Sequence, residues 1–372
     1  MGLIVTIYTL WVAISSLFIV SAFQVDIRNF LFKFIPKIYP GVSKYNVASV
    51  LAFVSEKSLE FASVKFLVML AIDKLGAFSS PIYGKVFILD MFGLGSLLSL
   101  IVANVIGAYH LDDVKEKLSS SRDVSNKSCS SLKKHIGRLS VNVRTGSILR
   151  FPYISYLPNW LLAKNNAERL VYKSHLLLNI FTPDDKSTNH PVVLWVCGRN
   201  KAESVIIPYL ASLGFVVVVP NYAQPPKYST AESVLFVKLC VEWISECIYC
   251  FNGDANQIYS VGEDTGAAVI MECLSKELPA NTIHGLFALA PRHNRDLQWS
   301  IKQSIPTFTL VPGVQEDNPE GDAKQADPNL HKFMSVSGAV PYYYKFSSPR
   351  TLATGDLIAE WLNHINTSKK VN

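Results

Sequence analysis

The stretch NGDANQIYSVGEDTGA, residues 252–267, decides the fold that this sequence predicts. Residues 258–261 are a short apolar run of the kind that forms a buried strand. Gly262 and Gly266 follow, and glycines at this spacing are typical of a sharp turn because they have no Cβ. Apolar residues at helical spacing come next. The stretch therefore predicts a strand, a tight turn and a helix, with Asp264 at the centre of the turn.

Short apolar runs alternate with amphipathic stretches from about residue 138 to the C-terminus. Continuous runs such as Val216 to Val219 are typical of strands buried on both faces, and their alternation with helices predicts a mostly parallel α/β sheet. The expected strands are residues 175–181, 192–196, 215–220, 258–261, 285–290, 308–311 and 342–346. The expected helices are residues 202–213, 230–249, 266–278 and 352–365.

The composition indicates a membrane protein. The chain has 372 residues, of which 49% are hydrophobic and only 17% are charged. Soluble domains contain about 25% charged residues, so we expect the apolar excess to lie in membrane segments. The net charge of +6 comes without a long basic run, which argues against a nucleic-acid partner. Six cysteines are too few for a disulfide scaffold, and their spacing predicts neither a metal site nor a cofactor.

Two segments are long and apolar enough to be transmembrane helices, about residues 3–24 and 91–109. The alternative for the first segment is a cleaved signal peptide. The segment lacks the basic residues with which a signal peptide begins, and this favours an uncleaved anchor. A third segment, about residues 58–76, either lies in the interface or crosses the bilayer. Basic residues occur on both sides of these segments, so the topology stays undetermined. We expect the bilayer of the endoplasmic reticulum or of another endomembrane as the partner.

These segments divide the chain into three parts. We expect a membrane region over residues 1–110, a polar Ser-rich linker over 111–137, and an α/β domain over 138–372.

Residues from about Val192 onward resemble the α/β-hydrolase fold-3 esterases, which include arylacetamide-deacetylase-like, steryl-acetyl-hydrolase-like and prenylcysteine-methylesterase-like enzymes. In that group a Gly-Asp-Pro-x-Arg-Ile run leads through a strand into Gly-x-Ser-Ala-Gly. This chain has GDANQI at 253–258 and GEDTG at 262–266. The resemblance implies an α/β-hydrolase fold in which Asp264 stands where the serine nucleophile is expected.

Acyl transfer needs a nucleophile, a histidine oriented by a carboxylate, and N–H donors for the oxyanion. The resemblance places the oxyanion donors at Gly198, Arg199 and Thr265, although the family's His-Gly-Gly-Gly reads Cys-Gly-Arg-Asn here. It places the acid at Glu316 or Asp317. The histidine should follow the last strand, where residues 347–350 read Ser-Ser-Pro-Arg. The expected site therefore lacks its base.

Asp264 allows two interpretations. It either attacks carbon as a carboxylate nucleophile or caps the following helix, where aspartate is favoured. Four histidines elsewhere in the sequence are the remaining candidates for the base, or are solvated or structural residues: His284, His293, His331 and His364. A cationic lip of Arg292, His293 and Arg295 either binds an anion beside Asp264 or is a solvated loop.

The sequence therefore predicts a membrane-anchored α/β-hydrolase-fold protein of the carboxylesterase and lipase lineage that has lost serine-hydrolase activity. It would bind a lipid-like ligand or a protein partner. The alternatives are an active ester or lipid hydrolase that uses Asp264 or a rebuilt site, and a structural membrane protein whose function lies in its first 110 residues.

Overall fold

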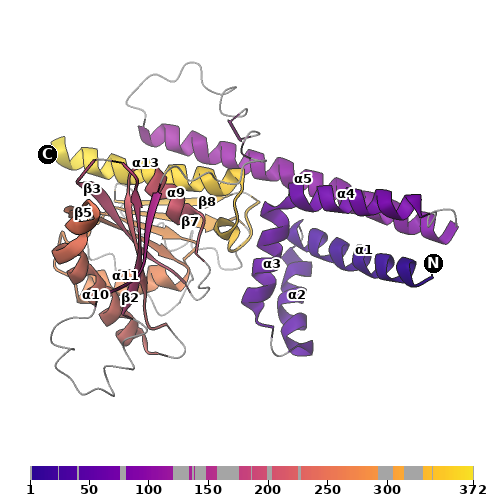
Figure 1. Ribbon diagram of the computed structural model, residues 1–372, viewed down its shortest axis with the longest axis horizontal. Helices are drawn as coiled ribbons and strands as arrows, with labels where there is room; N and C mark the ends of the chain where they lie inside the picture. The colour runs from indigo at the N-terminus through magenta and orange to yellow at the C-terminus, as the bar shows by residue number, and fades with distance from the viewer. Residues whose placement is uncertain are drawn as a thin grey trace.

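The computed structural model describes residues 2–23, 25–39, 42–75, 81–119, 134–135, 138, 148–156, 176–185, 187–198, 203–224, 228–291, 305–313, 330–336 and 338–371. It has two parts, an N-terminal helical region and an α/β domain, which are seen side by side in Figure 1.

The α/β domain is built on an eight-stranded sheet with the order β1-β2-β4-β3-β5-β6-β7-β8. The pairs β1–β2 and β2–β4 are antiparallel and all other neighbours are parallel. This confirms the mostly parallel sheet of the α/β-hydrolase fold that the sequence predicts. The strands are β1 (Ile148–Ser155), β2 (Leu177–Pro183), β3 (His190–Val196), β4 (Val216–Asn221), β5 (Gly253–Glu263), β6 (Leu286–Leu289), β7 (Thr307–Pro312) and β8 (His331–Val336).

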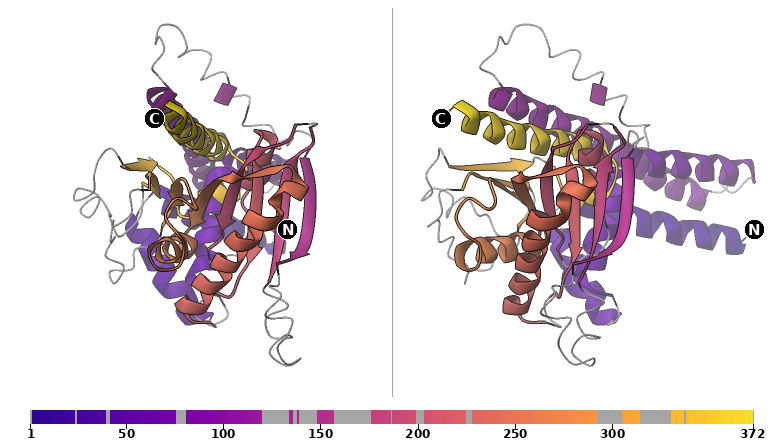
Figure 2. Two further views of the ribbon diagram at one scale, coloured as in Figure 1. Left: turned by 90° about the vertical axis from the view of Figure 1, so that its left-hand side faces the viewer. Right: turned by 60° about the vertical axis from the view of Figure 1, so that its left-hand side comes forward.

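Helices cover both faces of this sheet, as the two views of Figure 2 show. They are α9 (Ile206–Ser212), α10 (Thr230–Cys247), α11 (Thr265–Lys276) and α13 (Pro349–Val371). Alternate residues of one strand enter opposite cores: Val217 and Val219 belong to one cluster, Val216 and Val218 to the other. Because all four are buried, the valine run is a strand with two apolar faces.

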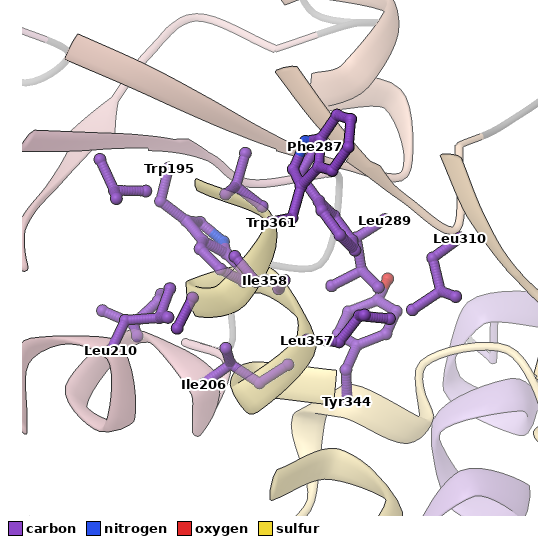
Figure 3. Packing of buried hydrophobic residues seen from close by; sticks show 14 of the residues in the cluster. Trp195, Ile206, Leu210, Phe287, Leu289, Leu310, Tyr344, Leu357, Ile358 and Trp361 are labelled. Carbon is purple, nitrogen blue, oxygen red and sulfur yellow. The ribbon is translucent and has the colours of Figure 1, made fainter. Parts of the chain in front are cut away.

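The first core lies between the sheet and α13. Trp195, Phe287 and Leu289 from the strands meet Leu357 and Trp361 of the helix (Figure 3). Trp195 is completely buried. Burial of a large apolar side chain contributes about 1.5–3 kcal/mol, so this layer is a main source of the stability of the domain.

The strand predicted at residues 342–346 is wrong. These residues include a 3₁₀ turn, η3 (Tyr343–Lys345), and the last strand is β8, which the sequence analysis missed together with β1. Tyr343 and Tyr344 are fully buried, but they pack into the core rather than pairing with a strand. Burial by packing gives the same apolar pattern as a short strand.

The helical region consists of α1 (Gly2–Phe23), α2 (Val25–Ile38), α3 (Lys44–Glu56), α4 (Ser58–Lys74) and α5 (Pro81–Ser119). Helices α1, α4 and α5 form a bundle that projects away from the sheet, and α2 and α3 run across it (Figure 1). By length and composition, α5 could cross a membrane over residues 84–118, and shorter apolar helices cover 6–22 and 46–56. Helix α5 continues to Ser119, so residues 111–119 are helical rather than part of a linker.

The two parts share one core. Helix α13 lies along α5 in both figures, and Ala48, Ala52, Ala108 and Leu111 belong to the same apolar cluster as Trp195. The helical region therefore packs on the domain as a structural partner.

Candidate functional site

The tight turn lies between β5 and α11, where the sequence places it. Asp264 has φ 53° and ψ −119°, a conformation that non-glycine residues rarely adopt. Both flanking glycines are required by close contacts. A Cβ on Gly262 would clash with the backbone of Ala267, and one on Gly266 would clash with the carbonyl oxygen of Val196. The turn thus has the strained strand-to-helix geometry of a nucleophile elbow.

The side chain of Asp264 lies against the backbone of Gly198. A Cβ added to Gly198 would be 2.5 Å from the Cβ of Asp264 and 2.8 Å from its Oδ2. Asp264 is only 6% exposed. Gly198 is the residue expected to contribute to the oxyanion site. Asp264 therefore brings a carboxyl group to this backbone, whereas catalysis requires N–H donors there.

The structure confirms the capping interpretation of Asp264 in its position, but not in a side-chain hydrogen bond. Asp264 stands at the N-cap position of α11, but its side chain makes no capping hydrogen bond. Its own N–H donates to the carbonyl oxygen of Leu289 at 3.1 Å, which ties the turn to β6. Thr265 is the first residue of α11. The carboxyl group is therefore directed at the Gly198 backbone and not at the helix amides.

A buried ion pair lies directly behind the elbow. Lys345 Nζ is 2.5 Å from Oε1 of Glu263, and the indole nitrogen of Trp195 donates to Oε2 at 3.3 Å. Glu263 is completely buried, and burial raises its pKa while Lys345 opposes the rise. Neither residue is among the site residues predicted from the sequence. Lys345 lies in η3, which belongs to the loop between the last strand and the last helix, where the histidine is expected. The side chain from this loop that reaches the elbow is thus a lysine, and it pairs with Glu263.

The neighbouring loop is held by hydrogen bonds. Tyr222 donates its hydroxyl to the carbonyl oxygen of Cys197 at 2.6 Å, and the Gln224 amide donates to the carbonyl oxygen of Gly198 at 3.1 Å. Burial raises the pKa of the Cys197 thiol to about 12. Because the thiolate is the reactive form, Cys197 is not a nucleophile at neutral pH.

Several histidines lie away from the elbow. His284 is bonded through Nε2 to the carbonyl oxygen of Asn256, near the start of β5, and His331 begins β8. Both are therefore at the amino edge of the sheet, whereas Asp264 follows the carboxyl end of β5. His364 stacks on Trp361 within α13. These positions do not suit a base for Asp264.

Other predicted site residues lie outside the described residues: Arg199, Arg292, His293, Arg295, Glu316 and Asp317. Among the residues that the structure does describe, no group of His, Cys, Asp or Glu could hold a metal ion.

Comparison with known proteins gives partial matches. No protein-family model matches the sequence. A probable isoprenylcysteine alpha-carbonyl methylesterase of Oryza sativa is 25% identical over 147 residues, which are 38% of this chain and 33% of the relative. The para-nitrobenzyl esterase of Bacillus subtilis is 28% identical over 163 residues, which are 38% of this chain and 32% of the relative. The matched stretch thus spans about a third of each relative.

An esterase structure from Rhizomucor miehei superposes with a TM-score of 0.48 at 15% identity and covers 71% of this chain and 98% of the esterase. The partial sequence matches, the sheet order and the glycine-flanked elbow support placing the chain with the esterase and lipase family of α/β-hydrolases.

Proposed function

We propose that this protein is a membrane-anchored member of the carboxylesterase and lipase lineage that has lost serine-hydrolase activity and acts as a binding or scaffold protein. The observation that carries the proposal is the position of Asp264. Its carboxyl group replaces the serine hydroxyl and lies against the Gly198 backbone, where an ester oxyanion needs to be stabilised.

The surroundings of Asp264 support the loss of activity. An aspartate nucleophile forms an ester that a histidine-activated water must hydrolyse. The loop expected to supply this histidine supplies Lys345, and Lys345 is paired with Glu263. An amine that is held against a buried carboxylate is not available as a general base for the elbow. Both ester chemistries therefore lack a proton acceptor at this position.

The anchor in this proposal is the bundle of α1, α4 and α5. Its outer surface is apolar, with large exposed side chains at Ile7, Leu10, Ile14, Val64, Leu67, Phe92, Leu98 and Val102. Its interior holds an ion pair between Lys65 and Asp90, and Tyr8 donates its hydroxyl to Asp90 at 2.5 Å. A bilayer favours a helix bundle that has an apolar outer surface and whose charged side chains are paired in its interior. We propose α4 as a third crossing and an endomembrane as the location.

The ligand in this proposal is lipid-like or a protein. A lipid-like ligand is favoured by the plant relatives, whose names describe methylesterases of isoprenylcysteine. A protein that kept such a recognition surface without the chemistry would hold or present the lipidated molecule.

The test measures hydrolysis of short-chain acyl esters by the full-length protein in lipid nanodiscs. Wild type, Asp264→Ala and Asp264→Ser are compared, with the para-nitrobenzyl esterase as the positive control. We expect no turnover above the empty-nanodisc rate for all three forms. Turnover by wild type that disappears in Asp264→Ala would contradict the proposal.

One observation favours the active alternative. The strained backbone of Asp264 persists although glycine would relieve it, and such strain gathers at functional sites. A rebuilt hydrolase would require this conformation, so the same ester assay discriminates between the two functions.

A further inference from the structure

Helix α2 exposes an unusual set of side chains. Phe30, Phe34 and Ile38 are 53%, 45% and 51% exposed, and Tyr39 just beyond the helix is 64% exposed. The spacing of four residues puts the first three on one side of the helix. The rings of Phe30 and Phe34 are stacked with centroids 4.9 Å apart. An exposed aromatic patch of this kind marks a surface that meets an apolar phase or a partner.

Another side of α2 packs into the protein. Leu31 is buried in the helical region at 2% exposure, and Arg28 at 1%. Helix α2 packs on α1 and α3. The aromatic side is therefore a second apolar surface and not the side that packs into the protein.

Lysines border the aromatic side. Lys33 and Lys37 are exposed and lie one turn apart, next to Phe34 and Ile38 along the helix. An apolar face bordered by lysines suits the boundary between acyl chains and phosphates, because the lysine stems can lie along the apolar surface while the amines reach the phosphates.

The orientation of α2 fits the same partner. Figure 1 shows α2 running across the direction of α1, α4 and α5, at the end of the bundle that meets the domain. If the bundle crosses the bilayer, a helix that runs across it at its end lies parallel to the membrane plane. A bundle that spans the membrane thus places α2, which carries these exposed aromatic side chains, at the depth of the headgroups.

From these observations we infer that α2 is an interfacial membrane helix. Phe30, Phe34 and Ile38 insert at the boundary between headgroups and acyl chains, and Lys33 and Lys37 contact lipid phosphates. The partner is the lipid surface of the same membrane that holds the bundle. This inference rests on the proposed membrane anchoring, and it moves the interfacial role from residues 58–76 to α2.

The test measures the depth of a fluorescent probe. The full chain with Cys129, Cys247 and Cys250 replaced by serine keeps three buried thiols, and burial raises the pKa of Cys197 and Cys273 to about 12, so they resist labelling. Single cysteines then replace Phe34 on α2, Leu98 on α5 or Leu235 on α10, which are all exposed in the structure. The labelled proteins are reconstituted in vesicles of phosphatidylcholine and phosphatidylserine.

Lipids with nitroxides at shallow or deep positions quench the probes. We expect the probe at 34 to be quenched mainly by shallow nitroxides, the probe at 98 mainly by deep ones, and the probe at 235 by neither. Quenching at 98 but not at 34 overturns the interfacial helix and leaves the anchor intact. A probe at 34 that is shielded from water but not quenched by any lipid points to a second protein copy and also overturns it. If none of the three probes is quenched, the anchor itself fails.

Discussion

Arg350 donates a hydrogen bond from Nη1 to Oε1 of Glu56 at 3.2 Å, and both side chains are almost completely buried. The same carboxylate accepts a hydrogen bond from Ser348 at 2.7 Å, and Arg350 also donates to the carbonyl oxygen of Gly338 at 2.9 Å. The end of α3 is thus joined to the start of α13. The loop that should carry a catalytic histidine is fixed instead to the helical region.

Replacing Arg350 with methionine should destabilise the protein by about 3–5 kcal/mol, because it leaves the Glu56 carboxylate buried without its partner. Replacing both Glu56 and Arg350 with apolar residues should cost much less. The matched control is Glu60→Gln, which removes the exposed pair with Lys57 and should change stability by less than about 1 kcal/mol. Denaturant unfolding in detergent measures all three. Equal effects of Arg350→Met and Glu60→Gln would contradict this role.

A chain that begins at Arg138 should fail to fold alone, because Ala48, Ala52, Ala108 and Leu111 complete its core. We expect it to aggregate in size-exclusion chromatography. Co-expression with residues 1–133 should restore a soluble complex in detergent, since the shared core can form between two pieces. A monomeric fragment that unfolds cooperatively without the helical region would show that the domain is independent.

The central strands of the sheet could be predicted from the sequence, whereas the two edge strands could not. Strands β3 and β4 and residues 258–263 of β5 are almost entirely buried on both faces, so their apolar runs predict strands. Strand β8 is an edge strand with half-exposed residues and carries little apolar signal, and β1 contains Pro152 and a register irregularity. Edge strands are the places where proline and polar residues are tolerated.

The candidate site was predictable only where it depends on local geometry. The elbow could be predicted from Gly262 and Gly266, because a close backbone approach needs glycine at those two positions. The pair of Glu263 and Lys345 was not predictable, since it joins residues distant in the sequence by packing alone. Lys345 was hidden in a Tyr-Tyr-Tyr-Lys run that resembles a strand.

Gly266→Ala should destabilise the protein by about 3 kcal/mol or more, because its Cβ would clash with the Val196 backbone and neither partner can move without breaking the sheet. Gly95→Ala is the matched control. Gly95 has open space around its Cβ position in α5, so alanine should raise helix stability by up to about 1 kcal/mol. Thermal unfolding in detergent reports both changes. Similar shifts for the two variants would mean that the elbow does not pack as described.

Glu263→Gln should change the pH dependence of stability. Burial holds the folded-state pKa of Glu263 above its ordinary value of 4.5 despite Lys345, with Asp264 adding to the rise. The folded protein therefore binds this proton more tightly than the unfolded chain, so the contribution is present at low pH and is lost as the pH rises through the folded pKa. Glutamine has no proton to lose. As the pH rises above about 4.5, the free energy of unfolding of the variant should therefore increase relative to that of wild type.

Urea unfolding at several pH values checks this difference. Glu272→Gln serves as the control, because Glu272 forms a partly exposed pair with Lys276 on α11. If the difference in the free energy of unfolding between wild type and Glu263→Gln stays constant across the pH range, folding does not change the pKa of Glu263. If the variant instead becomes less stable relative to wild type as the pH rises, Lys345 outweighs burial and the pKa of Glu263 is lowered on folding.

Asp264→Gly should be more stable than Asp264→Ala by about 1 kcal/mol or more, because glycine adopts the positive φ of the elbow without strain. Both variants lack the carboxylate, so their comparison isolates the backbone from the charge. Thermal unfolding of the two variants measures this difference. Equal stability of the glycine and alanine variants would show that the backbone at 264 relaxes in solution.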